Sequence, residues 1–197
     1  LPPGHWNLIA SQVAQSENLS LFDLTRLLAQ LNVAMADAAI AAWDTKYAFN
    51  QWRPITAIRQ ANTTQPAFGS PDLNWNPLIV TPSFPDYISG HSTFSGAAER
   101  VLTARFGEDY AFTTGSPDLP GVTRTFAGFA QAAEEASISR VYGGIHFRSS
   151  ADDGLAVGRN VGDWVLARFG DLADTAPPVI SVLSPGQDAV VAHQPAI

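Results

Sequence analysis

The sequence has 197 residues, of which 46% are hydrophobic, and it carries a formal net charge of −7. This length favours one main domain with a sizeable core, and the charge disfavours nucleic acid and anionic membranes as partners. The absence of cysteine excludes thiolate catalysis, disulfides and thiolate metal sites. No apolar run approaches the roughly 18 residues of a membrane-spanning helix, so we expect no membrane span.

The first predicted helix covers residues 19–47, where alanine and leucine are frequent and apolar residues recur at helical spacing. It is expected to be one long, mostly buried helix. Arg53 precedes Pro54, whose ring disfavours helical backbone at the residue before it, so the segment should end or bend there. Residues 60–87 are rich in proline, asparagine and threonine, which predicts a long loop.

Two further helices are predicted in the middle of the chain. One begins just after His91 and ends before Gly107, a residue suited to a C-terminal cap. The other covers about residues 125–142 and ends at Gly143-Gly144, which is a stop signal. We therefore expect several polar and charged residues to lie at helix ends.

The fourth predicted helix covers about residues 151–169, although three glycines lower its helix propensity. Those glycines, Gly154, Gly158 and Gly162, are spaced by four, so they share one face and would let another helix approach closely. The apolar residues expected to be buried on this helix are Leu155, Val161, Trp164, Val165 and Leu166.

The composition changes after Gly170. Residues 171–178 are typical of a linker, and residues 179–197 predict two short alternating strands around a Ser-Pro-Gly turn. We interpret residues 1–170 as one helical domain, and the tail as the hairpin stub of a following module or a segment that packs on a partner. The expected fold class is all-α, a helical bundle with its active site at helix ends and a short β-like C-terminal appendage.

Lys46 and Arg53 are seven residues apart, which on one helix would place both side chains on the same face. A point charge and a planar guanidinium could then grip a single anion. A solvated basic pair is the alternative, and it is the commoner reason for such a spacing.

Two other segments place polar groups at predicted helix ends. Ser89-Gly90-His91 would offer backbone N–H groups, a hydroxyl and the positive end of a helix dipole to an anion, although an ordinary N-terminal cap explains the same residues. Arg140 and His146 flank a glycine pair and could converge on one point, although Arg140 could instead cap its own helix.

Taken together, these segments resemble the superfamily of type 2 phosphatidic acid phosphatases and vanadium haloperoxidases. The pattern is Lys46, six residues and Arg53-Pro54, then Ser89-Gly90-His91, then Arg140, five residues and His146. The strings "WDTKYAFNQWRPITAIR", "FPDYISGHSTFSGAAERVLTARFG" and "EEASISRVYGGIHFRS" are similar to the bacterial haloperoxidase branch, and the similarity covers roughly residues 34–170.

The resemblance implies a vanadate cofactor, at a site that phosphate could also occupy, with hydrogen peroxide and a halide as substrates and hypohalous acid as product. It implies that His146 bonds the vanadium, that His91 is the acid–base residue and that Lys46 polarises the bound peroxide. Phe84 and Trp43 are candidates to shape the halide side. The residues implied to bind the oxygens of vanadate are Lys46, Arg53, Ser89, Gly90 and Arg140.

An acid phosphatase that forms a phosphohistidine at His146 is the alternative function, because the same cationic site suits phosphoryl transfer. A non-catalytic assembly or binding module is a third hypothesis. The family pattern places an aspartate four residues after the last histidine, where this chain has Ser150, so the carboxylate that orients His146 is open. Asp37, Glu134 and Glu135 are weak candidates.

The family and the tail together lead us to expect a secreted or periplasmic protein. The chain begins Leu1-Pro2-Pro3 without an initiator methionine, and larger family members carry additional helices before the first motif. We therefore expect a processed or trimmed protein that is either oligomeric or part of a longer chain.

Overall fold

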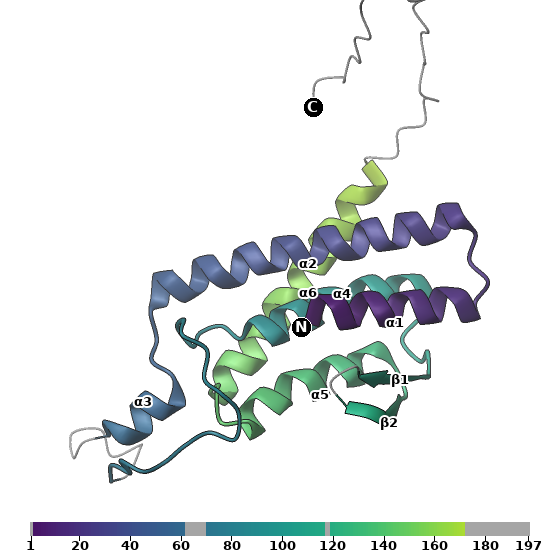
Figure 1. Ribbon diagram of the computed structural model, residues 1–197. Coiled ribbons are helices and arrows are strands. Elements are labelled where there is room, and N and C mark those ends of the chain that lie inside the picture. The colour runs from purple at the N-terminus through teal and green to yellow at the C-terminus, as the bar shows by residue number, and fades with distance from the viewer. Residues whose placement is uncertain (1, 62–69, 117–118, 172–197) are drawn as a thin grey trace, which may run out of the picture.

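The computed structural model describes residues 2–61, 70–116 and 119–171. These residues form six helices and one antiparallel hairpin (Figure 1). In chain order the elements are α1 (Pro2–Ser16), α2 (Leu21–Phe49), α3 (Pro54–Arg59), α4 (Gly90–Phe106), β1 (Phe112–Ser116), β2 (Leu119–Phe126), α5 (Phe129–Tyr142) and α6 (Arg148–Asp171).

Helix α4 is the central element of the bundle. It packs against α1, α2, α5 and α6, and Val101 and Leu102 on it are fully buried. Leu27 and Leu31 of α2 and Phe129 of α5 are in the same apolar cluster. Burial of a large apolar side chain stabilises the fold by about 1.5–3 kcal/mol, so this cluster accounts for much of the cohesion of the bundle. The prediction of a helical bundle is confirmed.

The closest helix pair joins α4 and α6 through the predicted glycine seam. A Cβ atom built on Gly158 would overlap the carbonyl oxygen of Thr93, and one on Gly154 would lie 2.8 Å from that of Ser89. From the other side, a Cβ atom on Gly96 would overlap the carbonyl oxygen of Leu155. The missing side chains therefore let the two backbones touch, which fixes the N-terminus of α4 against the first turns of α6.

The long helix α2 has clear start and stop signals. The Ser20 hydroxyl accepts from the backbone N–H of Asp23 at 3.1 Å, which caps the N-terminus. At the other end Asn50 adopts a left-handed conformation (φ 47°), and its N–H donates to the carbonyl of Lys46. Arg53 is extended and directly precedes α3, so the prediction that Lys46 and Arg53 share one helix face is wrong.

The hairpin was not predicted, and it corrects the start of α5. Thr125 pairs with Thr113 across β1 and β2, whereas the sequence pattern placed residue 125 at a helix start. The β-branched residues around it favour a strand. Gly128 is the N-cap of α5, which begins at Phe129, and a Cβ atom on Gly128 would overlap the carbonyl oxygen of Glu108.

Three smaller differences complete the comparison with the expected elements. Helix α1 was not predicted, although Trp6, Ile9 and Val13 form a buried stripe on it. Helix α4 begins at Gly90 instead of after His91. Trp164 is 51% exposed, so its expected burial is wrong, and Arg168 lies over its ring at 3.8 Å.

The predicted linker and C-terminal strands lie outside the described residues, apart from the end of α6 at Asp171. Within the described part of the chain, none of the helices has the length and apolar character that crossing a membrane requires.

Candidate active site at the helix ends

The three motif segments converge where helices end (Figure 1). The C-terminus of α2, the N-terminus of α4 and the C-terminus of α5 meet there, and the loop that leads into α4 crosses between them. A chain of hydroxyls joins the helices, because Ser92 Oγ of α4 lies 2.8 Å from Ser137 Oγ of α5, which donates to the carbonyl of Ala151 in α6. We call the predicted ligand set the cradle: Lys46, Arg53, Ser89, Gly90, His91, Arg140 and His146.

The Lys46 ammonium is fully buried and uses all three of its protons on backbone carbonyls. It donates to Pro85 at 3.0 Å, Asp86 at 3.0 Å and Ile88 at 2.6 Å. Burial, reinforced by the charge of Arg53, lowers the pKa of Lys46 to about 8, against an opposing effect of Asp86. Lys46 thus holds the loop before α4 and brings a positive charge to the site.

Asp86 is the carboxylate that the sequence interpretation missed. It is fully buried, and its Oδ1 atom lies 2.7 Å from His146 Nδ1 and 3.8 Å from Arg53 Nη1. Its backbone N–H donates to the carbonyl of Gln51, which ties the loop to the segment between α2 and α3. The signal available in the sequence was an isolated acid among the aromatics of "FPDYISGH", directly before the Ser-Gly-His motif.

The hydrogen bonds of His146 define its tautomer. Ser150 donates its hydroxyl proton to the carbonyl of Asp86 at 3.0 Å, so its oxygen accepts from His146 Nδ1 at 3.1 Å. Arg53 Nη1 lies 3.0 Å from Nε2 and can only donate, so Nε2 carries a lone pair. Burial lowers the pKa of His146 despite Asp86, which keeps the ring neutral.

The Arg53 guanidinium is buried and is directed toward His146. Its Nε donates to the carbonyl of Phe84 at 2.9 Å, and its Nη1 donates to that of Ile145 at 2.7 Å. Among the described residues, its Nη2 atom is buried without a hydrogen-bond partner. A buried charged donor left unsatisfied costs about 1–3 kcal/mol or more, so Nη2 is suited to an anion.

His91 and Arg140 form the second half of the cradle. Arg140 Nη1 lies 3.3 Å from His91 Nε2, so this arginine donates to a neutral imidazole. Burial first, and then the charge of Arg140, lowers the pKa of His91 to about 4. Ser89 caps α4 through Ser92, and its own N–H donates to the carbonyl of Ser150, which links the two halves.

Trp43 and Phe84 pack beside the cradle as an aromatic pair, with ring centroids 5.3 Å apart. Lys46 Nζ lies 5.2 Å from the centroid of Phe84 and 5.7 Å from that of Trp43. A Cβ atom on Gly90 would lie only 3.0 Å from the Trp43 ring, so a larger residue there would displace the indole.

The other acids considered from the sequence lie elsewhere. Glu135 pairs with Arg124 of β2, and Glu134 with Arg159 of α6. Asp37 lies on the middle of α2, away from its C-terminal end. Asp86, reached through the loop before α4, is the carboxylate that contacts His146, while the hydrogen bond at Nδ1 is made with Ser150 at the position where the family pattern has an aspartate.

Comparisons with known proteins agree on one family. Residues 26–175 match the family model described as the VCPO second helical-bundle domain. The chain is 27% identical over 202 residues to vanadium chloroperoxidase from Curvularia inaequalis, with 76% of this chain and 33% of the relative covered.

Solved structures give the same result. The structure of the first bacterial vanadium-dependent iodoperoxidase is 41% identical in sequence to this chain and matches it with a TM-score of 0.77. The match covers 85% of this chain and 39% of the iodoperoxidase chain. A holo-type bacterial vanadium-dependent chloroperoxidase, at 20% identity and a TM-score of 0.69, shares the fold, with 86% and 41% covered. The chain spans about a third to two fifths of the length of these proteins.

Proposed function

The chain belongs to the family of the VCPO second helical-bundle domain, and from that premise we propose that it carries the catalytic site of a vanadium-dependent haloperoxidase. The proposed reaction oxidises a halide with hydrogen peroxide to hypohalous acid. The observation that carries the proposal is the cradle itself, in which three cations, Lys46, Arg53 and Arg140, gather around one carboxylate and two neutral histidines.

The residues of the cradle fit a tetrahedral oxyanion such as vanadate. Arg53 Nη2 is buried and lacks a partner within the described chain, and the first-turn N–H groups of α4 at Gly90 and His91 have no acceptor inside their own helix. Three positive charges against one negative charge leave an excess of two, which matches a singly or doubly charged anion. When bound, vanadate would supply the Lewis acidity that activates hydrogen peroxide.

His146 is proposed as the vanadium ligand. Because Nδ1 carries the proton and donates it to Ser150, the lone pair lies on Nε2, where it could coordinate vanadium once Arg53 Nη1, now 3.0 Å away, is displaced. Arg53 now occupies that lone pair and would turn toward an anion oxygen when the site is filled. Arg140 and the α4 N-terminus at Ser89 and Gly90 would hold further oxygens.

Lys46 is proposed to act chiefly through its charge and through the loop that it holds. Its three protons are already donated to carbonyls, so direct contact with an oxygen would require one of those hydrogen bonds to be exchanged. A pKa of about 8 keeps the ammonium largely charged at neutral pH.

His91 is proposed as the acid–base residue. With its pKa lowered to about 4 by burial and by Arg140, it is neutral and can accept the proton that hydrogen peroxide loses on entering the site. An anion in the cradle would raise that pKa again, which would make proton return easier. Trp43 and Phe84 would bound the side from which the halide enters, because polarisable anions are compatible with aromatic edges next to an ammonium.

Oxidation of iodide and bromide by hydrogen peroxide tests the proposal, with metal-stripped protein assayed before and after orthovanadate is added. We expect activity only with vanadate, and a loss of roughly 10³-fold or more in His146→Ala. Circular dichroism would verify that the variant is folded. Steady hydrolysis of a phosphomonoester, lost in the same variant, with no halide oxidation, would support the phosphatase alternative.

A further inference from the structure

Helix α2 carries a row of exposed side chains along one face. The helix lies along the outer edge of the bundle and packs inward against α1, α4 and α6, and its opposite face is exposed (Figure 1). The exposed positions follow in steps of three or four residues, which is one line on a helix of 3.6 residues per turn. The apolar members of this row, which we call the α2 stripe, are Phe22, Ala29, Val33, Ala36, Ile40 and Tyr47. Arg26 and Asp44 complete the stripe.

We propose that the α2 stripe binds the same stripe on a second copy of this chain, with the two helices antiparallel and a twofold axis between Val33 and Ala36. A twofold axis makes every contact occur twice, because each residue meets its counterpart's partner on the other copy. Residues that are equally distant from the axis along the two helices then face each other. The proposal is independent of the proposed function.

Side-chain size is complementary near the axis. Val33 of one copy faces Ala36 of the other, and further along the helix Ile40 faces Ala29. A large side chain therefore meets alanine at each of these positions, so the helix axes can approach to about 8 Å without a clash. Ile40 is 69% exposed in the single chain, and the contact would remove this apolar surface from water.

Charge and aromatic character are complementary toward both ends of the stripe. Arg26 of one copy faces Asp44 of the other, and beyond them Phe22 faces Tyr47. Within the part of the chain that the structure describes, neither Arg26 nor Asp44 forms an ion pair, so both are available to the second copy. A parallel pair in register would place arginine against arginine and aspartate against aspartate, and this repulsion selects the antiparallel arrangement.

The length of the stripe sets the strength of the contact. From Phe22 to Tyr47 it extends over about 37 Å, at a rise of about 1.5 Å per residue. A single pair of helices of this length forms a contact at the lower end of the range of specific interfaces, about 1,200 Å² in total. We therefore expect a reversible dimer with a dissociation constant on the order of 10 μM.

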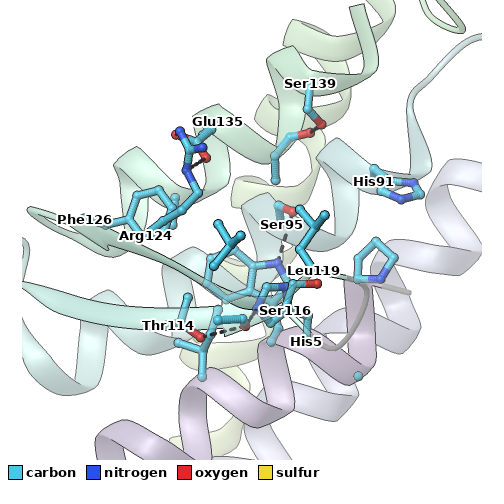
Figure 2. A pocket seen from close by; sticks show the side chains of 18 of the residues that line it. His5, His91, Ser95, Thr114, Ser116, Leu119, Arg124, Phe126, Glu135 and Ser139 are labelled. Atoms are coloured by element: carbon cyan, nitrogen blue, oxygen red, sulfur yellow. Dashed lines mark hydrogen bonds and ion pairs between the residues drawn. The ribbon is translucent and has the colours of Figure 1, made fainter. Parts of the chain in front are cut away.

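The proposed contact leaves the cradle open. Lys46 precedes Tyr47 in the sequence, but its ammonium is buried and donates to the carbonyl of Ile88 inside the bundle. Figure 2 shows the cavity that borders the cradle at His91, and its described lining residues come from α1, α4, α5 and the hairpin, with none from α2. Association and chemistry can therefore be measured separately.

Sedimentation equilibrium tests whether the stripe is the interface. Over concentrations from tenfold below to tenfold above the expected dissociation constant, the wild type should change from the mass of one chain to that of two. Ile40→Glu should weaken dimerisation at least 30-fold, because it places an unpaired carboxylate in the contact twice. Leu78→Glu makes the same change of charge on the loop before α4, at a side chain that is 85% exposed, and should leave the dimer unchanged.

Exchanging the two charges tests the antiparallel alignment. Arg26→Asp or Asp44→Arg alone places like charges opposite each other twice in a dimer, so each variant should dimerise at least tenfold more weakly than the wild type. An equimolar mixture of these two variants should form a heterodimer of wild-type strength, because every aspartate then faces an arginine. The variant that carries both exchanges should also dimerise as the wild type does.

A wild-type chain that remains monomeric over the whole concentration range would overturn the proposal. So would a dimer that Ile40→Glu weakens no more than Leu78→Glu does. If Arg26→Asp, Asp44→Arg and their mixture all dimerise equally well, the antiparallel alignment is wrong. Circular dichroism verifies the folding of each variant, and every exchanged side chain is exposed in the single chain.

Discussion

Positive charge is balanced differently in two regions of this bundle. On α6, Arg159 Nε lies 2.6 Å from Oε2 of Glu99, a buried carboxylate on α4. Its Nη2 lies 3.4 Å from Oε1 of Glu134, an exposed carboxylate on α5. Partial burial lowers the pKa of Arg159, but the hydrogen bond and the charge of Glu99 raise it, and the pKa lies above its ordinary value. In this cluster one cation faces two carboxylates, and the ion pairs connect three helices.

The cradle is balanced in a different way. Burial lowers the pKa values of Lys46, Arg53 and Arg140, and Asp86 is the one carboxylate paired with the set among the described residues. Carbonyl oxygens and imidazole nitrogens accept the remaining hydrogen bonds. The protein has a net charge of −7, so this local excess is not an effect of composition. A carboxylate-rich cluster stabilises the fold, whereas a carboxylate-poor one is arranged for an anion.

The largest effect is expected from Arg53→Ala. Loss of two charge-assisted hydrogen bonds to the anion should weaken orthovanadate binding about 100-fold, or about 2.7 kcal/mol. Isothermal titration calorimetry would measure this, with Arg105→Ala as the control because Arg105 makes an exposed pair with Asp23. Equal affinity in the two variants would remove the distinction between the regions.

Arg159→Ala should produce the opposite pattern. It leaves Glu99 buried without its cation, so the free energy of unfolding should fall by roughly 2 kcal/mol, a value reduced from that of a fully buried pair because Arg159 is a third exposed. Urea unfolding would measure the change. Orthovanadate affinity should stay at the wild-type value, and a parallel loss of affinity would show that the two clusters are coupled.

Asp86→Asn tests whether the negative charge of Asp86 weakens or strengthens orthovanadate binding. If Asp86 only opposed the anion, its neutralisation would tighten binding. We expect binding to weaken about tenfold instead, because the carboxylate orients His146 and holds its proton on Nδ1. Calorimetry again gives the answer, and Asp152→Asn, on an exposed pair with Arg148, is a suitable control.

The smallest effect concerns pH. The pKa of His91 in the fold is about 4, below its ordinary value of 6.5, so the unfolded chain binds more protons in this interval and stability is lost as pH falls from about 6.5 to about 4. His91→Gln should reduce this loss by roughly 1 kcal/mol, after allowance for solvent screening of a partly exposed ring. Thermal unfolding across this pH range, with and without phosphate, would measure it. An identical pH dependence in the wild type and the variant would contradict the assignment.

The sequence was sufficient for the parts of the site that depend on local spacing. Ser89-Gly90-His91 caps a helix, and Arg140 ends one, because capping and helix termination depend on a few adjacent residues. The seam of Gly154, Gly158 and Gly162 could also be predicted, since a four-residue period places all three on one face.

The features that were missed depend on contacts between distant segments. Asp86 acquires its role because Lys46 and Gln51 hold its loop against His146, and no local pattern encodes those contacts. Lys46 and Arg53 do not share a helix face as expected, because α2 ends before Asn50, whose left-handed conformation turns the chain. The hairpin was missed because the helical spacing of α5 was extended backward through Thr125.

The most direct test of the account is calorimetric titration of orthovanadate into metal-stripped wild-type protein and into His146→Ala. We expect one orthovanadate per chain in the wild type, bound at least tenfold more tightly than in the variant, with both proteins folded by circular dichroism. Folded wild-type protein that binds no orthovanadate, or a variant that binds it equally well, would contradict the assignment of the cradle as an oxyanion site.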